Sequence, residues 1–143
     1  MRLNLPVISD AADYSRHFHD EIWRQAVATI CERHNLPYKS LRRSPQGENI
    51  IFFVDETLVV KIFAPFRDNY LRETTALEFA QGKLSIRTPE LICTGEIEDW
   101  SYLVMTQIPG QASREVWASI GLRDRLEIAS HLGVAMRELH AHA

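Results

Sequence analysis

The residue whose type and setting first suggest chemistry is a lysine within an apolar run. Lys61 lies in the sequence Leu-Val-Val-Lys-Ile-Phe of residues 58–63, a composition that predicts a strand. Strand alternation places Lys61 on the same side as Val59 and Phe63, where an unpaired ammonium is costly to desolvate. A lysine held in this way, with a helix glutamate to orient it, could bind the phosphate oxygens of a phosphoryl donor.

The next segment, residues 68–82, predicts a helix that could supply this glutamate. Asp68 or Asn69 is the expected cap, and Gly82 is the expected stop signal. The predicted apolar stripe of this helix comprises Ala76, Leu77, Ala80 and Leu84. Glu73 falls in the middle of the stripe and Glu78 falls off it, so Glu73 is the expected partner. The alternative is an edge strand, from which Lys61 reaches water while Glu73 is solvated.

Four further strands are predicted around the one that carries the lysine. Runs at residues 38–43, 50–54 and 57–63 form a meander, joined by a turn over residues 44–49 and by the tight pair Asp55-Glu56. Residues 90–97 and 102–107 predict two more strands, joined by Glu98-Asp99. The sheet is therefore expected to be antiparallel.

Helices are expected before and after the sheet. Residues 19–34 place Trp23, Ala26, Val27 and Ile30 on one face, and Asn35 and Pro37 end this helix. After the break at Pro109-Gly110, residues 113–120 predict a short helix capped by Ser113. Residues 122–142 predict a long amphipathic helix, whose apolar stripe comprises Leu122, Ala129, Leu132, Met136 and Leu139. Clustered strands followed by helices predict an α+β fold: a five-stranded antiparallel sheet with one packed helix.

Composition narrows the class of protein. The 143 residues include 45% hydrophobic and 24% charged residues, which is typical of a globular domain. A net charge of -3 argues against a nucleic-acid binder, and we expect no nucleic-acid partner. Only two cysteines occur, so neither a disulfide scaffold nor a cysteine-rich zinc site is expected. No apolar run approaches the ~20 residues that cross a bilayer, so a cytoplasmic protein without a membrane partner is expected.

The histidines do not predict a metal site. His17, His19, His131 and His142 have no carboxylate or cysteine at ligand spacing, and His140 and His142, two residues apart, do not share a helix face. We therefore expect no metal ligands.

A series of short motifs occurs in order along residues 40–142. These are Ser44-x-x-Gly47-x-Asn49, then Leu58-Val59-Val60-Lys61-Ile62, Leu71-Arg72-Glu73, Thr88-Pro89-Glu90-Leu91, Tyr102-Leu103-Val104-Met105 with Pro109-Gly110, and Leu132-Gly133-x-x-Met136-x-x-Leu139-His140. Their order and spacing resemble the N-terminal lobe of the aminoglycoside phosphotransferase family, which has a protein-kinase-like fold. The resemblance implies three parts: a helical extension over residues 1–37, a nucleotide-binding lobe over 38–108, and a helical segment over 109–143 that begins an absent second lobe.

The resemblance also implies roles for six residues in nucleotide binding. Lys61 would contact the α- and β-phosphates of ATP, or of GTP, with Glu73 as its partner. Gly47 and Asn49 would lie in the turn that covers the phosphates. The main chain of Thr106 and Ile108 would hold the base.

The catalytic part of the family's pattern does not occur in these 143 residues. The family's His-Gly-Asp-x-x-x-x-Asn loop supplies the base, and a later aspartate holds magnesium; neither motif is present. We therefore expect a truncated kinase that binds nucleotide without transferring phosphate, with no catalytic residue, and with Mg only where the missing lobe is present.

Other hypotheses stay open at this point. The chain could be a non-catalytic nucleotide-binding or protein-interaction module derived from the same lobe. The stripe of the last helix also predicts self-association, because contiguous exposed apolar surface is typical of an interface. A helical dimerisation protein is a further alternative, although Arg125 lies in its seam. The phosphate acceptor is not specified.

Overall fold

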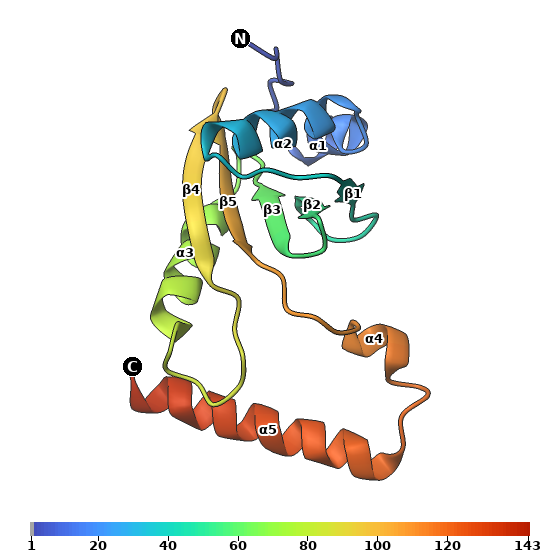
Figure 1. The fold of residues 1–143 in the computed structure, drawn as a ribbon, viewed down its shortest axis with the longest axis vertical. Coiled ribbons are helices and arrows are strands. Elements are labelled where there is room, and N and C mark those ends of the chain that lie inside the picture. The colour runs from blue at the N-terminus through green and yellow to red at the C-terminus, as the bar shows by residue number, and fades with distance from the viewer. Residues whose placement is uncertain (1) are drawn as a thin grey trace.

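The computed structural model describes residues 2–143 and is built around one antiparallel sheet (Figure 1). Its strands are β1 (Leu41–Arg43), β2 (Ile50–Val54), β3 (Leu58–Ile62), β4 (Leu91–Ile97) and β5 (Trp100–Thr106), in the spatial order β1-β2-β3-β5-β4. The helices of this part of the chain are α1 (Ala11–His17), α2 (Ile22–Arg33), α3 (Asn69–Ala80), α4 (Ser113–Val116) and α5 (Leu122–Ala141). The predicted α+β class and five-stranded antiparallel sheet are confirmed.

Two acidic turns set the register of the sheet. Asp55 and Glu56 join β2 to β3 with φ of 50° and 52°, and Glu98 and Asp99 join β4 to β5 with φ of 46° and 70°. Positive φ at both central residues is the geometry of the two-residue turn that matches the twist of paired strands. These turns hold β2 against β3 and β4 against β5, as the sequence predicted.

The main core lies between one face of the sheet and the helices α1 and α2. The rings of Trp23 on α2 and Trp100 on β5 meet edge to face, with centroids 4.5 Å apart. The other fully enclosed members of this core include Ala26, Val27, Ile30, Ile50, Val60, Ile62, Tyr102 and Val104. The alternating residues of β2 and β3 face the other way, so the second face of the sheet is left for α3 and for a cavity.

Helix α1 was not expected from the sequence. It has seven residues, begins after Asp10, and is capped by the Asp10 carboxylate, which accepts the Asp13 amide at 2.9 Å. Its inner residue is Tyr14, which is 5% exposed. A helix of two turns is too short for its apolar period to stand out in the sequence, and it is held by packing rather than by propensity.

Helix α3 differs in detail from its prediction. Asp68 occupies the cap position, but its side chain forms no capping hydrogen bond. Gly82, with φ of 70°, follows the end of the helix as expected. The assignment of Ala76 to the buried stripe is wrong: Ala76 is exposed and Thr74 is buried. A threonine can be buried here because its hydroxyl donates to the Tyr70 carbonyl at 2.9 Å.

The C-terminal helices lie apart from the sheet (Figure 1). Helix α4 is shorter than predicted, and its cap position is Ala112 rather than Ser113. Helix α5 spans the predicted segment and is attached near its end, where Glu138 accepts the Ser85 amide at 2.8 Å. Its outward side chains remain largely exposed, namely Leu122 (72%), Leu126 (62%), Leu132 (54%) and Met136 (58%). Within residues 2–143, no helix has the length and apolar character needed to cross a membrane.

Candidate functional site

The predicted contact between Lys61 and Glu73 is present in the structure. The Lys61 Nζ lies 2.8 Å from the Glu73 Oε2, and the two side chains are 19% and 33% exposed. β3 lies inside the sheet between β2 and β5, so the edge-strand alternative is wrong. Lys61 points to the face opposite Val60 and Ile62, because successive side chains of a strand alternate. Glu73 reaches it from α3, which packs against β4 and β5.

The turn of residues 44–49 lies on the same face as this ion pair. Ile51 is the direct cross-strand neighbour of Lys61, and a Cβ added at Gly47 would stand 3.4 Å from the Ile51 Cδ1. Gly47 has φ of 108°, which side-chain-bearing residues rarely adopt. The backbone of the turn therefore bends back towards the row of residues that contains Lys61, and glycine is the residue that permits this bend.

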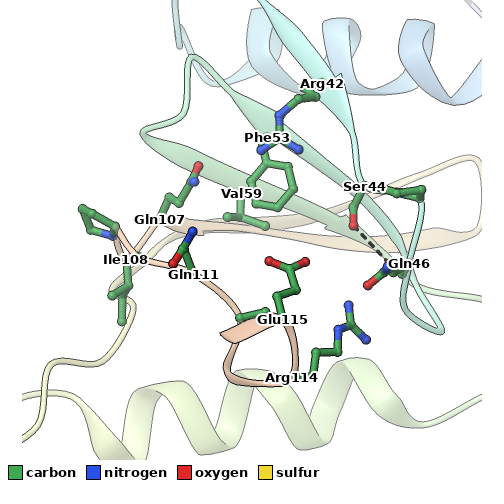
Figure 2. Close-up of a pocket in the computed structure, with 14 residues that line it drawn as sticks. Arg42, Ser44, Gln46, Phe53, Val59, Gln107, Ile108, Gln111, Arg114 and Glu115 are labelled. Atoms are coloured by element: carbon green, nitrogen blue, oxygen red, sulfur yellow. Dashed lines mark hydrogen bonds between the residues drawn. The ribbon is translucent and has the colours of Figure 1, made fainter. Parts of the chain in front are cut away.

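A cavity of about 660 Å³ opens on this face of the sheet (Figure 2). Phe53 on β2 and Val59 on β3 form an apolar wall, and Figure 2 shows Glu115 and Arg114 approaching from the opposite side. The remaining lining residues come from β1, from the turn of residues 44–46, and from residues 107–112. The cavity therefore combines an apolar wall with charged groups of both signs, which suits a ligand that has both apolar and polar parts.

A charged network lies at the rim of this cavity. The Arg42 guanidinium donates to both Glu56 oxygens, at 2.6 and 2.8 Å, and stacks 4.2 Å from the centroid of the Phe53 ring. The Gln107 amide donates to the same carboxylate at 3.2 Å. The Arg42 and Gln107 hydrogen bonds lower the pKa of Glu56 to about 2, so this carboxylate is ionised at neutral pH. The network ties the β2–β3 turn to the segment that leaves β5.

The sequence did not single out Arg42, Glu56 or Gln107 as site residues. Strand alternation could have placed Arg42 beside Phe53, because the two residues are paired across β1 and β2. The contact of Glu56 with Gln107 spans 51 residues and had no local signal.

Of the six predicted site residues, only Ile108 lines the cavity; Lys61 lies on the same face of the sheet, but neither it nor Glu73 is among the lining residues. Ile108 lines the cavity, and its main-chain amide has no hydrogen-bond partner within residues 2–143. Thr106 ends β5, where its amide donates to the Glu90 carbonyl at 2.9 Å. Asn49 is half-buried before β2 and makes no side-chain hydrogen bond among the residues described.

Gly47 lines a second, smaller cavity of about 320 Å³ instead of the larger one. This smaller cavity lies between the turn and helix α1. The turn of residues 44–49 therefore separates two cavities: Ser44 to Gln46 border the larger, and Gly47 and Glu48 border the smaller. Over residues 2–143 the structure shows no group of three or more side chains suited to holding a metal ion.

Comparison with known proteins identifies the fold. No protein-family model matches the chain, and no curated protein sequence matches it. Solved structures do. A ternary complex of APH(2'')-IIa with streptomycin and ATP matches at 21% identity and a TM-score of 0.59, covering 94% of this chain and 41% of that one. A GDP complex of a mutant aminoglycoside 2'-phosphotransferase IIIa matches at 16% identity and a TM-score of 0.65, covering 82% and 41%.

A third match is the ADP-bound aminoglycoside phosphotransferase APH(2'')-Ib, at 21% identity and a TM-score of 0.59, covering 81% of this chain and 39% of that one. The chain thus spans about two fifths of the length of the solved proteins that it matches. At these identities the likeness concerns the fold: the α+β arrangement predicted here is the one found in part of each of these phosphotransferases.

Proposed function

We propose that residues 38–108 form the nucleotide-binding lobe of an ATP-dependent small-molecule O-phosphotransferase. The observation that carries this proposal is the Lys61–Glu73 ion pair, which joins the central strand β3 to helix α3 on the face that bears the cavity. Phosphoryl-transfer enzymes of the kinase type use such a pair to hold the donor's phosphates. The fold shared with three solved phosphotransferases, whose complexes contain ATP, GDP and ADP, supports the same assignment.

Each part of the site fits one part of a nucleotide. The Lys61 ammonium has three N–H donors, of which Glu73 takes one, so the others can bind phosphate oxygens. Phe53 and Val59 offer an apolar wall for the base. The unpartnered Ile108 amide at the edge of the cavity can donate to a ring nitrogen of the base. Because this contact uses the main chain, both adenine and guanine nucleotides are candidate ligands.

Transfer itself requires groups that these 143 residues do not contain. The sequence has no His-Gly-Asp loop that could supply a base. We therefore propose that this chain binds the nucleotide and does not by itself phosphorylate a hydroxyl acceptor, and we assign no residue to magnesium. A phosphorylated product from the isolated chain would contradict this part of the proposal.

Calorimetric titration with ATP and with GTP tests the proposal. Unsubstituted protein should bind at least one of them saturably, and Lys61→Ala should weaken binding at least about tenfold, equivalent to 1.4 kcal/mol. Lys39→Ala is the matched control, because Lys39 is exposed before β1 and lies outside both cavities. Absence of binding, or equal affinity of Lys61→Ala and the unsubstituted protein, would contradict nucleotide binding at this site.

The exposed stripe of α5 favours a second activity, self-association with another copy of this chain. Leu122, Leu132 and Met136 are each more than half exposed although they follow one side of the helix. Arg125, which the sequence placed in the seam, turns back and donates to the Trp117 carbonyl at 2.7 Å. The guanidinium is therefore directed towards the end of α4 and not towards the centre of the apolar stripe. The stripes of two copies could pack against each other, because the exposed side chains of both would be apolar.

A further inference from the structure

Helix α1 holds the turn of residues 44–49 from the side opposite the larger cavity. The Tyr14 hydroxyl donates to the Glu48 main-chain carbonyl at 2.8 Å. The Tyr14 ring is buried and packs against Phe18, with centroids 5.4 Å apart, and against Trp100, with centroids 6.2 Å apart. The hydroxyl is therefore fixed by the core, and the turn is fixed by the hydroxyl.

Two arginines hold the same turn at its ends. Arg43, the last residue of β1, donates through Nη2 to the Phe18 carbonyl at 2.7 Å, just beyond α1. Arg67 lies over the Tyr14 ring, 5.6 Å from its centroid, and 3.7 Å from the Glu48 carboxylate. Arg67 lies two residues before the start of α3, the helix that carries Glu73. The contacts of Arg67 with Tyr14 and Glu48 therefore link the turn of residues 44–49 to α3, the helix whose glutamate orients Lys61.

The hydroxyl of Tyr14 acts as a donor over the whole neutral range. Burial raises its pKa to about 12, so it stays protonated. Among residues 2–143, Tyr14 is the one residue that donates a hydrogen bond to the Glu48 carbonyl. Removal of the Tyr14 hydroxyl alone is expected to loosen residues 48–49, at the end of the turn, while the packing of the ring is retained.

We propose that Tyr14 is a positioning residue for a nucleoside triphosphate: by holding the Glu48 carbonyl, it keeps the turn in the conformation that faces Lys61. This inference rests on the proposed function, because it takes the phosphates to lie under the turn. The ligand chemistry at stake is the polyphosphate and not the base, since the base-facing residues of the cavity lie on β2, β3 and residues 107–112. Tyr14 would act through the turn without touching the nucleotide.

The test compares Tyr14→Phe with Tyr38→Phe in the 143-residue chain. Tyr38 is 39% exposed, lies outside both cavities, and its hydroxyl forms no hydrogen bond within residues 2–143, so it controls for loss of a tyrosine hydroxyl. Two measurements are made on each variant: hydrogen–deuterium exchange of the amides of residues 44–51, and titration with ATP and with adenosine. Thermal unfolding monitors the fold.

For Tyr14→Phe we expect exchange in the turn to accelerate and ATP affinity to fall about three- to tenfold, the effect of one lost hydrogen bond. Adenosine affinity should stay within about twofold, because adenosine has no phosphates for the turn to cover. Tyr38→Phe should change neither quantity. A general loss of structure would weaken ATP and adenosine together, and that result overturns the positioning role.

The remaining outcomes also decide the matter. Unchanged exchange in Tyr14→Phe overturns the inference alone, whatever the ATP affinity, and so does faster exchange with unchanged ATP affinity. Failure of the unsubstituted chain to bind either ATP or GTP overturns the proposed function and this inference with it. The titration of the unsubstituted protein is therefore done first. It tests nucleotide binding by itself, so failure of the proposed function can be distinguished from failure of the role of Tyr14.

Discussion

The Lys61 ammonium and the Glu73 carboxylate lie 2.8 Å apart although 12 residues and a change of secondary structure separate them. Their meeting depends on how α3 is placed against β3. The Phe63 and Tyr70 rings, one following β3 and the other in the first turn of α3, pack edge to face with centroids 5.6 Å apart. This aromatic contact sets the start of the helix close to the end of the strand, so that one turn later Glu73 reaches the lysine.

Removing the two partners of this pair should have unequal effects on stability. Glu73→Gln leaves the Lys61 ammonium, only 19% exposed, without its counter-ion, and should lower the free energy of unfolding by about 1–2 kcal/mol. Lys61→Met keeps the aliphatic stem and leaves a carboxylate that water can reach, so its cost should stay below about 1 kcal/mol. Urea denaturation measures both.

Glu78→Gln is the control for this comparison, since Glu78 is exposed on α3 and forms no ion pair within residues 2–143. Its effect should lie within about 0.5 kcal/mol of zero. If Lys61→Met were the more destabilising of the two site variants, the asymmetry argued from exposure would be wrong.

Gly95→Ala should be strongly destabilising for a reason unrelated to backbone freedom. A Cβ at Gly95 would stand 2.7 Å from the Cζ of Tyr102, its cross-strand partner. Tyr102 cannot easily move aside, because its hydroxyl contacts the His34 Nε2 at 2.9 Å and accepts from Arg33 at 3.1 Å. Overpacking of this kind costs about 1–3 kcal/mol, and thermal and urea unfolding would measure it.

The matched control for this variant is Gly133→Ala on α5. An added Cβ there meets nothing within 4 Å, and the φ of Gly133 is ordinary for a helix. Replacement of glycine inside a helix should raise stability by up to about 1 kcal/mol. The changes in the free energy of unfolding are therefore expected to have opposite signs in the two glycine variants. A neutral Gly95→Ala would show that β4 and β5 can accommodate the added methyl group, which would contradict the close contact with Tyr102.

Acid unfolding should depend on Glu56. Its pKa in the folded protein is about 2, below the ordinary value of 4.5, chiefly because Arg42 and then Gln107 hydrogen-bond to the ionised carboxylate. A depressed pKa contributes stability that is present above the ordinary value and is lost as the pH falls from about 4.5 to about 2. The loss of stability over this range should be shallower in Glu56→Gln, as followed by urea denaturation at successive pH values.

Glu78→Gln, on the exposed side of α3, should retain the full acid dependence of the unsubstituted protein. The rim network also predicts that Arg42→Gln reproduces the shallower profile, since Arg42 supplies the largest contribution. A parallel loss of stability in Glu56→Gln and the unsubstituted protein would mean that the Arg42–Glu56 contact does not persist in solution.

Leu132→Glu should abolish self-association through α5. Leu132 is 54% exposed in the middle of the apolar stripe, so a carboxylate there would be buried without a partner in any dimer formed by this face. Sedimentation velocity at increasing protein concentration would detect a dimer in the unsubstituted chain and a monomer in the variant. Ser130→Glu places the same charge about 200° around the helix and should not change the association. If the unsubstituted chain were a monomer at all concentrations, the proposed self-association through α5 would be wrong.

The local patterns of the sequence were sufficient for the sheet and for one ion pair. Alternation across residues 58–63 put Lys61 on a defined face, and the period of residues 68–82 put Glu73 on the helix side that meets it. The turns at Asp55-Glu56 and Glu98-Asp99 were visible because two polar residues between two β-branched runs leave few other geometries. These features depend on neighbours close in sequence.

Other parts of the site were decided only in three dimensions. Helix α1 gave no periodic signal, yet its Tyr14 holds the Glu48 carbonyl across 34 residues. The contact between Gln107 and Glu56 spans 51 residues, and the burial of Thr74 in place of Ala76 follows from where α3 lands on the sheet. Hydrophobic period fixes which face of an element is buried, because it is a property of one segment. Hydrogen bonds between distant segments depend on how the elements pack, and packing is a property of the whole chain.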